Sequence, residues 1–254
     1  MRMMMTDASP RPAPPVPLEP LAAPESFLSA ADALGVVFDD GDVERLGLYL
    51  ALLLEANRAF NLTSITEPEE AWNRHILDSL TLMALLAELP EGARVADIGS
   101  GGGAPAIPLA IVMPHLRFTL IEATGKKADF LRDAAKRLGL KNIEVVNERA
   151  ETVGQDHKRR REVYDAVTAR AVGKIAVVAE LTVPLAKVGG QILLIKGEKA
   201  PEELEAAAGA LDLLRASCAG VVETPTGRIV VLEKLAKTPR DYPRRPGEPK
   251  RAPL

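Results

Sequence analysis

One segment constrains the fold of this chain more than any other: VADIGSGGGAPAIP, residues 95–108, in which four of five consecutive positions are glycine. An apolar run that ends in such a turn predicts a buried strand, a loop and then a helix. Because glycine has no Cβ, a ligand can approach the backbone of this loop closely. Ligands of open α/β sheets bind beyond the carboxyl ends of the strands, so the loop is the first candidate for a binding site.

Strand and helix patterns alternate after this loop. Apolar runs predict strands at 117–123, 143–147, 164–170 and 189–197, and helices at 126–139, 177–188 and 201–214. Two further runs, 219–224 and 227–235, flank a Pro-Thr-Gly turn and predict an antiparallel hairpin. The alternation is typical of an α/β fold with helices on both faces of the sheet. We therefore expect a Rossmann-like, mostly parallel, seven-stranded sheet with an antiparallel C-terminal hairpin.

The ends of the chain differ in composition from this domain. Seven prolines predict a disordered leader over residues 1–25. Residues 26–90 form a predicted helical subdomain, with one helix at 42–60 and another at 68–89 that begins at Pro68 with Thr66 as N-cap. We assign residues 91–236 to the α/β domain and 237–254 to a basic tail.

Charge and composition limit the functional classes. The whole chain has a net charge of −3, whereas residues 234–254 hold seven basic and two acidic side chains, a net charge of +5. A basic tail is a candidate polyanion contact, and a solubilising tail is the alternative. The single cysteine, Cys218, excludes a disulfide framework and a cysteine-rich zinc site. With no long apolar run and no secretory signal, we expect a cytoplasmic protein without a membrane partner.

Two ligand classes compete for the glycine loop. The spacing of Gly99, Gly101 and Ala104 fits a dinucleotide fingerprint, and Glu122 lies where an acid would hold ribose hydroxyls in either case. Asp97, however, would repel a pyrophosphate but attract a cationic sulfonium. Pro105 crowds the start of the following helix, where a dinucleotide needs free N–H groups. These features favour S-adenosylmethionine over a nicotinamide cofactor, and a methyltransferase over an oxidoreductase.

The methyl acceptor can be narrowed by elimination. A cytosine-C5 enzyme needs a nucleophilic cysteine, and Cys218 is more typical of a packed small residue. TARAV, residues 168–172, stands where an exocyclic-amine enzyme would show an Asn/Asp-Pro-Pro-aromatic turn. What remains is a nucleophile that needs no deprotonation before it attacks, and guanine N7, whose lone pair can attack the methyl group in line, is one such nucleophile. Arg170 could donate to guanine O6, although a strand-end salt bridge is an equally open interpretation.

RHILDS, residues 74–79, is a second polar cluster on an otherwise apolar helix. His75 and Ser79 are four residues apart, as are Arg74 and Asp78. The cluster could fold over the ligand site. A salt bridge within the helix, beside a surface histidine, is the alternative that the spacing alone favours.

Several motifs together resemble one family. They are NLTSI (61–65), RHILDSL (74–80), DIGSGGGAPAIPLAI (97–111) and KTPRDYPRRPGEPKRAPL (237–254), with RAE (149–151), TARAV and LIKG (194–197) between them. The chain resembles the RsmG (GidB, glucose-inhibited division protein B) family of 16S rRNA guanine-N7 methyltransferases over essentially everything after residue 30. It departs from the family at Ala104, often a larger apolar residue, and at Ala106, often glycine.

The resemblance implies a class I methyltransferase fold with a helical N-terminal extension, S-adenosylmethionine as donor, no metal, and 16S rRNA or the small ribosomal subunit as partner. His75, Asp78 and Arg170 would face the reacting end or the RNA. Glu122 would hold the ribose, and Ala150 and Glu151 would lie beside the adenine. The complete set expected to bind the donor is Asp97, Gly99, Ser100, Gly101, Gly103, Pro105, Glu122, Ala123, Ala150, Glu151 and Arg170.

Basic side chains outside this site are candidate phosphate contacts, or simply a solvated face: Lys126, Lys127, Arg132, Lys136, Arg137, the run 158–161 and the tail. Tyr242 in the tail could stack on a base. We expect a monomer. Besides the oxidoreductase, a non-catalytic RNA-binding module of ribosome assembly stays open as an alternative.

Overall fold

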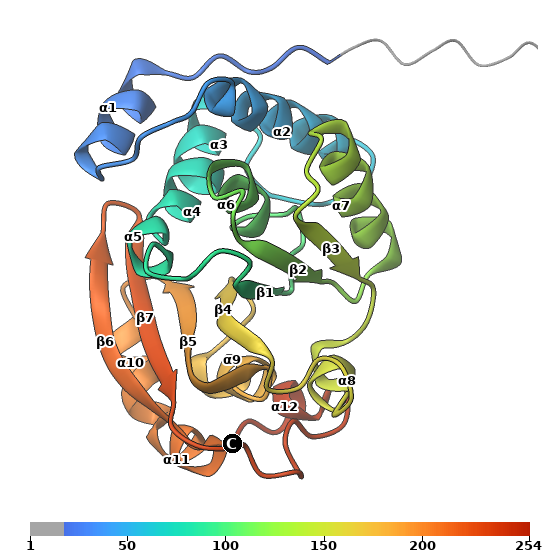
Figure 1. The fold of residues 1–254 in the computed structure, drawn as a ribbon, viewed down its shortest axis with the longest axis vertical. Helices are drawn as coiled ribbons and strands as arrows, with labels where there is room; N and C mark the ends of the chain where they lie inside the picture. Colours follow the sequence, from blue (N-terminus) through green and yellow to red (C-terminus); the bar gives the residue numbers. More distant parts are fainter. Residues whose placement is uncertain (1–17) are drawn as a thin grey trace, which may run out of the picture.

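The computed structural model describes residues 18–254, and these contain a seven-stranded sheet (Figure 1). Its strand order is β3-β2-β1-β4-β5-β7-β6. The strands are β1 Arg94–Ile98, β2 Arg117–Ile121, β3 Ile143–Val146, β4 Tyr164–Arg170, β5 Ala186–Lys196, β6 Ala216–Thr224 and β7 Gly227–Lys234. The strands β1 to β5 pair in parallel, and β7 lies antiparallel between β5 and β6. The predicted α/β sheet with its antiparallel hairpin is thus confirmed.

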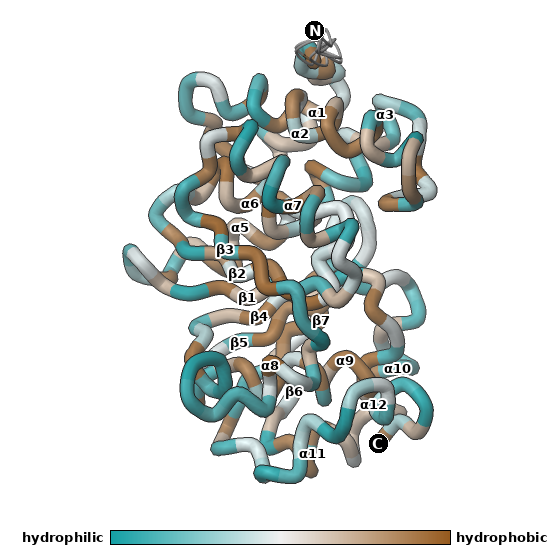
Figure 2. Tube along the Cα trace, turned by 90° about the vertical axis from the view of Figure 1, so that its right-hand side faces the viewer, coloured by the Kyte–Doolittle hydropathy of each residue, from teal (hydrophilic) through white to brown (hydrophobic). Residues whose placement is uncertain are grey.

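Helices cover both faces of the sheet, and each face has its own apolar core. One layer contains α1 Glu25–Ala33, α2 Asp42–Asn57, α3 Pro68–Ala71, a π-helix η1 Trp72–Leu77, α4 Asp78–Leu80, α5 Met83–Leu86, α6 Ala106–Val112 and α7 Gly125–Arg137. The other contains α8 Ala150–Gly154, α9 Ile175–Thr182, α10 Ala200–Ala206, α11 Ala208–Leu214 and α12 Glu248–Arg251. Figure 2 shows apolar strands between the two layers. Neighbouring residues of β1, Val95 and Ala96, belong to different cores because side chains alternate across a strand.

Three predicted helices differ from those observed. The helix expected at 68–89 begins at Pro68 but is divided into α3, η1, α4 and α5. Its N-cap is Glu67, without a side-chain cap hydrogen bond, so the prediction of Thr66 is wrong. The helix expected at 177–188 ends at Thr182, before Pro184, which lacks the N–H that a helix interior needs. The helix expected at 201–214 is interrupted at Ala207, between α10 and α11.

Residues 18–25, which the sequence assigns to the N-terminal leader, are packed against the domain. Residues 1–17 of the expected leader lie outside the described residues. From Leu18 onward, however, the chain packs against the helical core, and the backbone N–H of Leu21 donates to the carbonyl of Gly47 across 3.1 Å. A Cβ at Gly47 would lie only 2.3 Å from the Leu21 carbonyl oxygen, so this close approach depends on the glycine.

The basic tail is folded onto the domain. Arg161, buried beneath it, donates to the carbonyls of Thr238, Pro239 and Tyr242. The guanidinium of Arg244 forms an ion pair with the fully buried Glu180 at 2.6 Å. Arg161 and Arg244 therefore have internal partners, unlike the phosphate contacts expected for this region. Lys234 is also fully buried and forms an ion pair with Glu162.

Candidate active site

The glycine loop lies at the carboxyl end of β1, where the sheet reverses its strand order between β1 and β4. Such a switch point is where open α/β sheets bind ligands. Gly99, Gly101 and Gly103 have φ values of +68°, +54° and +102°, a region that favours glycine. The hydroxyl of Tyr49, from α2, donates to the carbonyl of Gly102 across 2.9 Å and braces the loop.

Two cavities meet at this loop, and Gly99 lines both. The first, here called the Glu122 cavity, has a volume of about 500 Å³ and extends past the ends of β1 and β2. The second, the Arg170 cavity, has a volume of about 730 Å³ and lies between the loop, β4 and the N-terminal helices. Of the predicted donor-binding residues, Glu122, Ala123, Ala150 and Glu151 line the first cavity, whereas Ser100, Gly101 and Arg170 line the second.

Glu122 orients the loop as well as lining the cavity. One carboxylate oxygen accepts the N–H of Gly101 at 2.9 Å, and the other accepts the N–H of Thr124 at 2.7 Å. Each carboxylate oxygen can accept a further hydrogen bond, so both remain available to vicinal hydroxyls. The neighbouring acid Glu151 is buried, and one of its oxygens accepts the N–H of Gly247 at 2.8 Å.

Three predicted donor-binding residues line neither cavity: Asp97, Gly103 and Pro105. Asp97 is buried behind the loop, where its Oδ1 accepts the Thr168 hydroxyl at 2.8 Å and its Oδ2 has no partner among residues 18–254. Burial raises the pKa of Asp97 to about 6, because a low-dielectric interior disfavours the charged form. These three residues can influence a ligand through the shape and the field of the loop.

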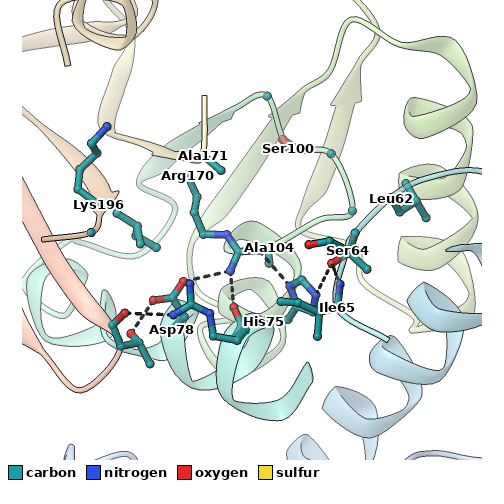
Figure 3. Close-up of a pocket in the computed structure, with 18 of the residues that line it drawn as sticks. Leu62, Ser64, Ile65, His75, Asp78, Ser100, Ala104, Arg170, Ala171 and Lys196 are labelled. Atoms are coloured by element: carbon teal, nitrogen blue, oxygen red, sulfur yellow. Dashed lines mark hydrogen bonds and ion pairs between the residues drawn. The ribbon is translucent and has the colours of Figure 1, made fainter. Parts of the chain in front are cut away.

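The Arg170 cavity brings together the three residues expected to be catalytic (Figure 3). The guanidinium of Arg170, at the end of β4, donates to Asp78 Oδ2 at 3.1 Å and to His75 Nδ1 at 3.0 Å. It also donates to the carbonyl of Arg74. The alternative interpretation, a salt bridge between Arg74 and Asp78 within the helix, is wrong, because Asp78 pairs with Arg170. His75 is buried, so the surface-histidine interpretation is also wrong.

The contacts of His75 determine its protonation. A guanidinium only donates, so Nδ1 of His75 must accept, and the ring proton lies on Nε2. Nε2 is 3.0 Å from the hydroxyl oxygen of Thr63, which is its acceptor. Burial, together with the charges of Arg170 and Arg74, lowers the pKa of His75 to about 4. At neutral pH this histidine is therefore uncharged.

Sequence reasoning missed three residues of the site: Tyr49, Thr63 and Thr226. The hydroxyl of Thr226, in the β6–β7 turn, donates to Asp78 Oδ1 at 2.6 Å. Thr63 lies in the NLTSI motif, and this motif was the one signal in the sequence that could have predicted its place in the site. Tyr49 and Thr226 had no local signal. The prediction that Cys218 is packed is wrong, since it is exposed on the edge strand β6.

Residues 18–254 hold no group of three or more His, Cys, Asp or Glu side chains that could bind a metal ion. Nor do these residues form a helix with the length and hydropathy that crossing a membrane requires.

The residues of the Glu122 cavity fit a nucleoside with a cationic sulfur. Its aliphatic side chains, which include Ile98, Ile121 and Val177, offer an apolar slot for a purine. Glu122 offers acceptors for a ribose. Gly99 lines both cavities, and a Cβ there would lie 3.1 Å from the side chain of Val172, so the absence of a side chain lets the loop pack closely at the point where the cavities meet. The fold and the residues of the site together define the class of protein as an S-adenosylmethionine-dependent methyltransferase.

Comparison with known proteins identifies the family. The family described as "rRNA small subunit methyltransferase G" matches residues 42–228, and the chain belongs to it. A relative of that name from Sorangium cellulosum is 50% identical over 234 residues, covering 91% of this chain and 97% of its own. Another from Rubrobacter xylanophilus is 43% identical and covers 92% of each chain. The expected family and methyltransferase class are confirmed.

A solved structure supports the fold. The crystal structure of a mutant of MtNAS in complex with S-adenosylmethionine matches with a TM-score of 0.51 and 21% identity, covering 83% of this chain and 84% of that one. At this identity the likeness concerns the fold alone.

Proposed function

We propose that this protein transfers a methyl group from S-adenosylmethionine to N7 of a guanine in 16S rRNA. The observation that carries the proposal is the state of the two ionisable groups beside Arg170. His75 is neutral and accepts from Arg170, and Asp78 accepts from both Arg170 and Thr226. Neither is free to act as a general base, which suits N7, a nucleophile that carries no proton to remove.

The residues divide into two roles. S-adenosylmethionine, when bound, supplies an electrophilic methyl group on a sulfonium. The Glu122 cavity would hold its nucleoside, with Glu122 accepting from the ribose and Ala150 and Glu151 beside the adenine. Gly99, Ser100 and Gly101 would lie between the nucleoside and the acceptor. Asp97 behind the loop would contribute a favourable field for a cation.

Arg170 would recognise the guanine. A guanidinium has five N–H donors, and three hydrogen bonds hold Arg170 in place, to Arg74, Asp78 and His75. The remaining donors can pair with guanine O6, the natural acceptor for arginine. Held in this way, the base would present N7 in line with the methyl group, and catalysis would come from positioning and exclusion of water.

Basic side chains around the Arg170 cavity suit an RNA substrate. Lys127 and Lys199 line the cavity together with Arg74. They would contact phosphates near the target base. We infer that the small ribosomal subunit or its 16S rRNA is the partner, and that the enzyme acts in the cytoplasm as a monomer. The alternatives of an oxidoreductase and of a non-catalytic RNA-binding module receive no support from the family.

The proposal is tested by measuring methyl transfer to rRNA and then mapping the position of the methylated base. Small-subunit rRNA from cells lacking this enzyme is incubated with radiolabelled S-adenosylmethionine, and N7-methylguanine is located by reduction and aniline cleavage. We expect one labelled guanine. Binding of RNA without transfer would favour the assembly module, and label at any other atom would contradict the N7 assignment.

Arg170→Ala separates recognition of the base from binding of the donor. We expect kcat to fall by about 100-fold, because the base loses its positioning group, while the affinity for S-adenosylhomocysteine stays within about threefold. Arg170→Lys keeps the charge but lacks the planar fork, so it should recover only part of the rate. An unchanged kcat in Arg170→Ala would remove this residue from the mechanism.

A further inference from the structure

The C-terminal segment forms part of the wall of the Glu122 cavity. Gly247, Pro249, Lys250 and Arg251 line it, opposite residues that come from the sheet and from α9. The sequence predicted this segment as an RNA-binding or solubilising tail. The structure instead places it beside the site proposed for the nucleoside of the donor.

The segment is held in place on both sides of α12. Before the helix, the backbone N–H and Nε–H of Arg244 donate to Glu180 Oε1 at 2.8 and 2.9 Å. After the helix, the carbonyl of Ala252 accepts a hydrogen bond from the same guanidinium at 2.8 Å. Because Glu180 is fully buried and has Arg244 as its ionic partner, release of the segment would leave a carboxylate in the core without compensation. This anchorage makes the segment a fixed wall.

Two features of the segment act on the cavity directly. Gly247, at a φ of +82°, turns its N–H toward Glu151 and fixes that carboxylate at 2.8 Å. Pro249 is buried and continues the apolar lining formed by Val172, Val177 and Leu181. Lys250 and Arg251 are exposed at the rim.

We propose that residues 246–254 are a donor-binding element that holds the adenosine end of S-adenosylmethionine. Pro249 supplies apolar surface for the purine, and Gly247 orients Glu151 toward it. The inference rests on the proposed location of the donor in the Glu122 cavity. It assigns to the basic tail a role in cofactor binding that its charge does not suggest.

The first test is a chain that ends at Arg245. Calorimetry with S-adenosylhomocysteine should give an affinity at least about tenfold weaker than that of the full chain, since part of the apolar wall and the contact to Glu151 are lost. Circular dichroism confirms that the shortened chain folds. The matched control is the double variant Lys237→Ala and Arg240→Ala, which removes two exposed charges of the basic tail that line neither the Glu122 cavity nor the Arg170 cavity. Its affinity should stay within about threefold of that of the full chain.

A milder variant covers the case in which the shortened chain does not fold. Pro249→Gly removes the ring but leaves the backbone and the Arg244 anchor, and should weaken binding of S-adenosylhomocysteine by about three- to tenfold. Unchanged affinity in a folded truncated chain, or in Pro249→Gly, overturns the proposal. If truncation lowers only the affinity for rRNA, the tail is an RNA contact instead. A full chain that does not bind S-adenosylhomocysteine would contradict the proposed function itself, which separates the two failures.

Discussion

Arg170 and His75 are joined by a hydrogen bond of 3.0 Å in which the guanidinium donates to Nδ1 of the imidazole. The contact links the end of β4 to the π-helix η1, two elements that are distant in the sequence. It also sets the chemistry of the site, because a histidine that accepts from arginine must be neutral.

The pKa of His75 gives a prediction for stability. Its pKa is about 4 in the folded protein and 6.5 in a free side chain. As pH falls below 6.5 the unfolded chain binds the proton first, so the free energy of unfolding decreases between pH 6.5 and 4. Between pH 7 and 5 this contribution amounts to about 2 kcal/mol.

Urea unfolding at the two pH values measures this effect. The variant His75→Asn keeps an acceptor for Arg170 and cannot titrate, so its stability should fall less than that of the wild type. Equal losses in both proteins would contradict the assignment. Nitrogen-15 NMR should also show the proton on Nε2 throughout pH 5.5 to 8.

Thr63 offers a second prediction. Its hydroxyl oxygen accepts from His75 Nε2 and from the N–H of Ile65, at 3.0 and 3.1 Å. The two lone pairs are then used, and the hydroxyl proton can point into the Arg170 cavity, which Thr63 lines. Thr63→Val should therefore lower kcat by about tenfold, because it removes one neutral hydrogen bond and leaves His75 less firmly held. Thr63→Ser keeps the hydroxyl and should restore kcat.

The control for Thr63 is Thr119→Val, a buried position in β2 away from both cavities. It should leave kcat and KM unchanged. Affinity for S-adenosylhomocysteine should be the same in all three variants. A kcat of Thr63→Val equal to that of the wild type would restrict Thr63 to a structural role.

Asp97 predicts a pH dependence of donor binding. Its pKa is about 6 in the absence of a ligand, and a nearby cation favours the ionised form. Binding of S-adenosylmethionine should therefore strengthen by up to about tenfold as pH rises from 5 to 7, the change in the ionised fraction across that range. S-adenosylhomocysteine, which lacks the sulfonium charge, should show a weaker dependence.

Calorimetry with both compounds at pH 5, 6 and 7 checks the prediction for Asp97. Asp97→Asn keeps the hydrogen bond from Thr168 and should make the affinities for the two compounds vary with pH in the same way. If the affinities of Asp97→Asn for the two compounds still differ in their pH dependence as they do in the wild type, a group other than Asp97 interacts with the sulfonium.

Gly103 and Gly139 form a matched pair for the glycine loop. Both have a positive φ, +102° and +69°. A Cβ at Gly103 would lie 2.5 Å from the side chain of Ile107, whereas a Cβ at Gly139 would have no other atom within 4 Å. Gly139→Ala should cost about 1 kcal/mol from backbone strain alone. Gly103→Ala should cost about 2–4 kcal/mol from strain and overpacking together.

Urea unfolding measures both alanine variants. Donor affinity should fall only in Gly103→Ala, where the loop must shift. If the two variants lose equal stability, steric contact at Gly103 is not what shapes the loop.

The sequence determined the local features of this protein. Glycines after an apolar run gave the strand, loop and helix around residues 95–112, and apolar periodicity gave the sheet and its closing hairpin. The family resemblance predicted that His75, Asp78 and Arg170 lie in one site, and in the structure hydrogen bonds join them. These features depend on backbone preferences and side-chain alternation, which act over a few residues.

Tertiary structure decided the remaining parts of the site. Thr226 reaches Asp78 across 148 positions, and the tail reaches Glu151 across 96. Asp97 lines neither cavity and accepts the hydroxyl of Thr168 on the neighbouring strand. No local pattern encodes such contacts, because they arise only when distant elements pack and each buried polar group must find a partner.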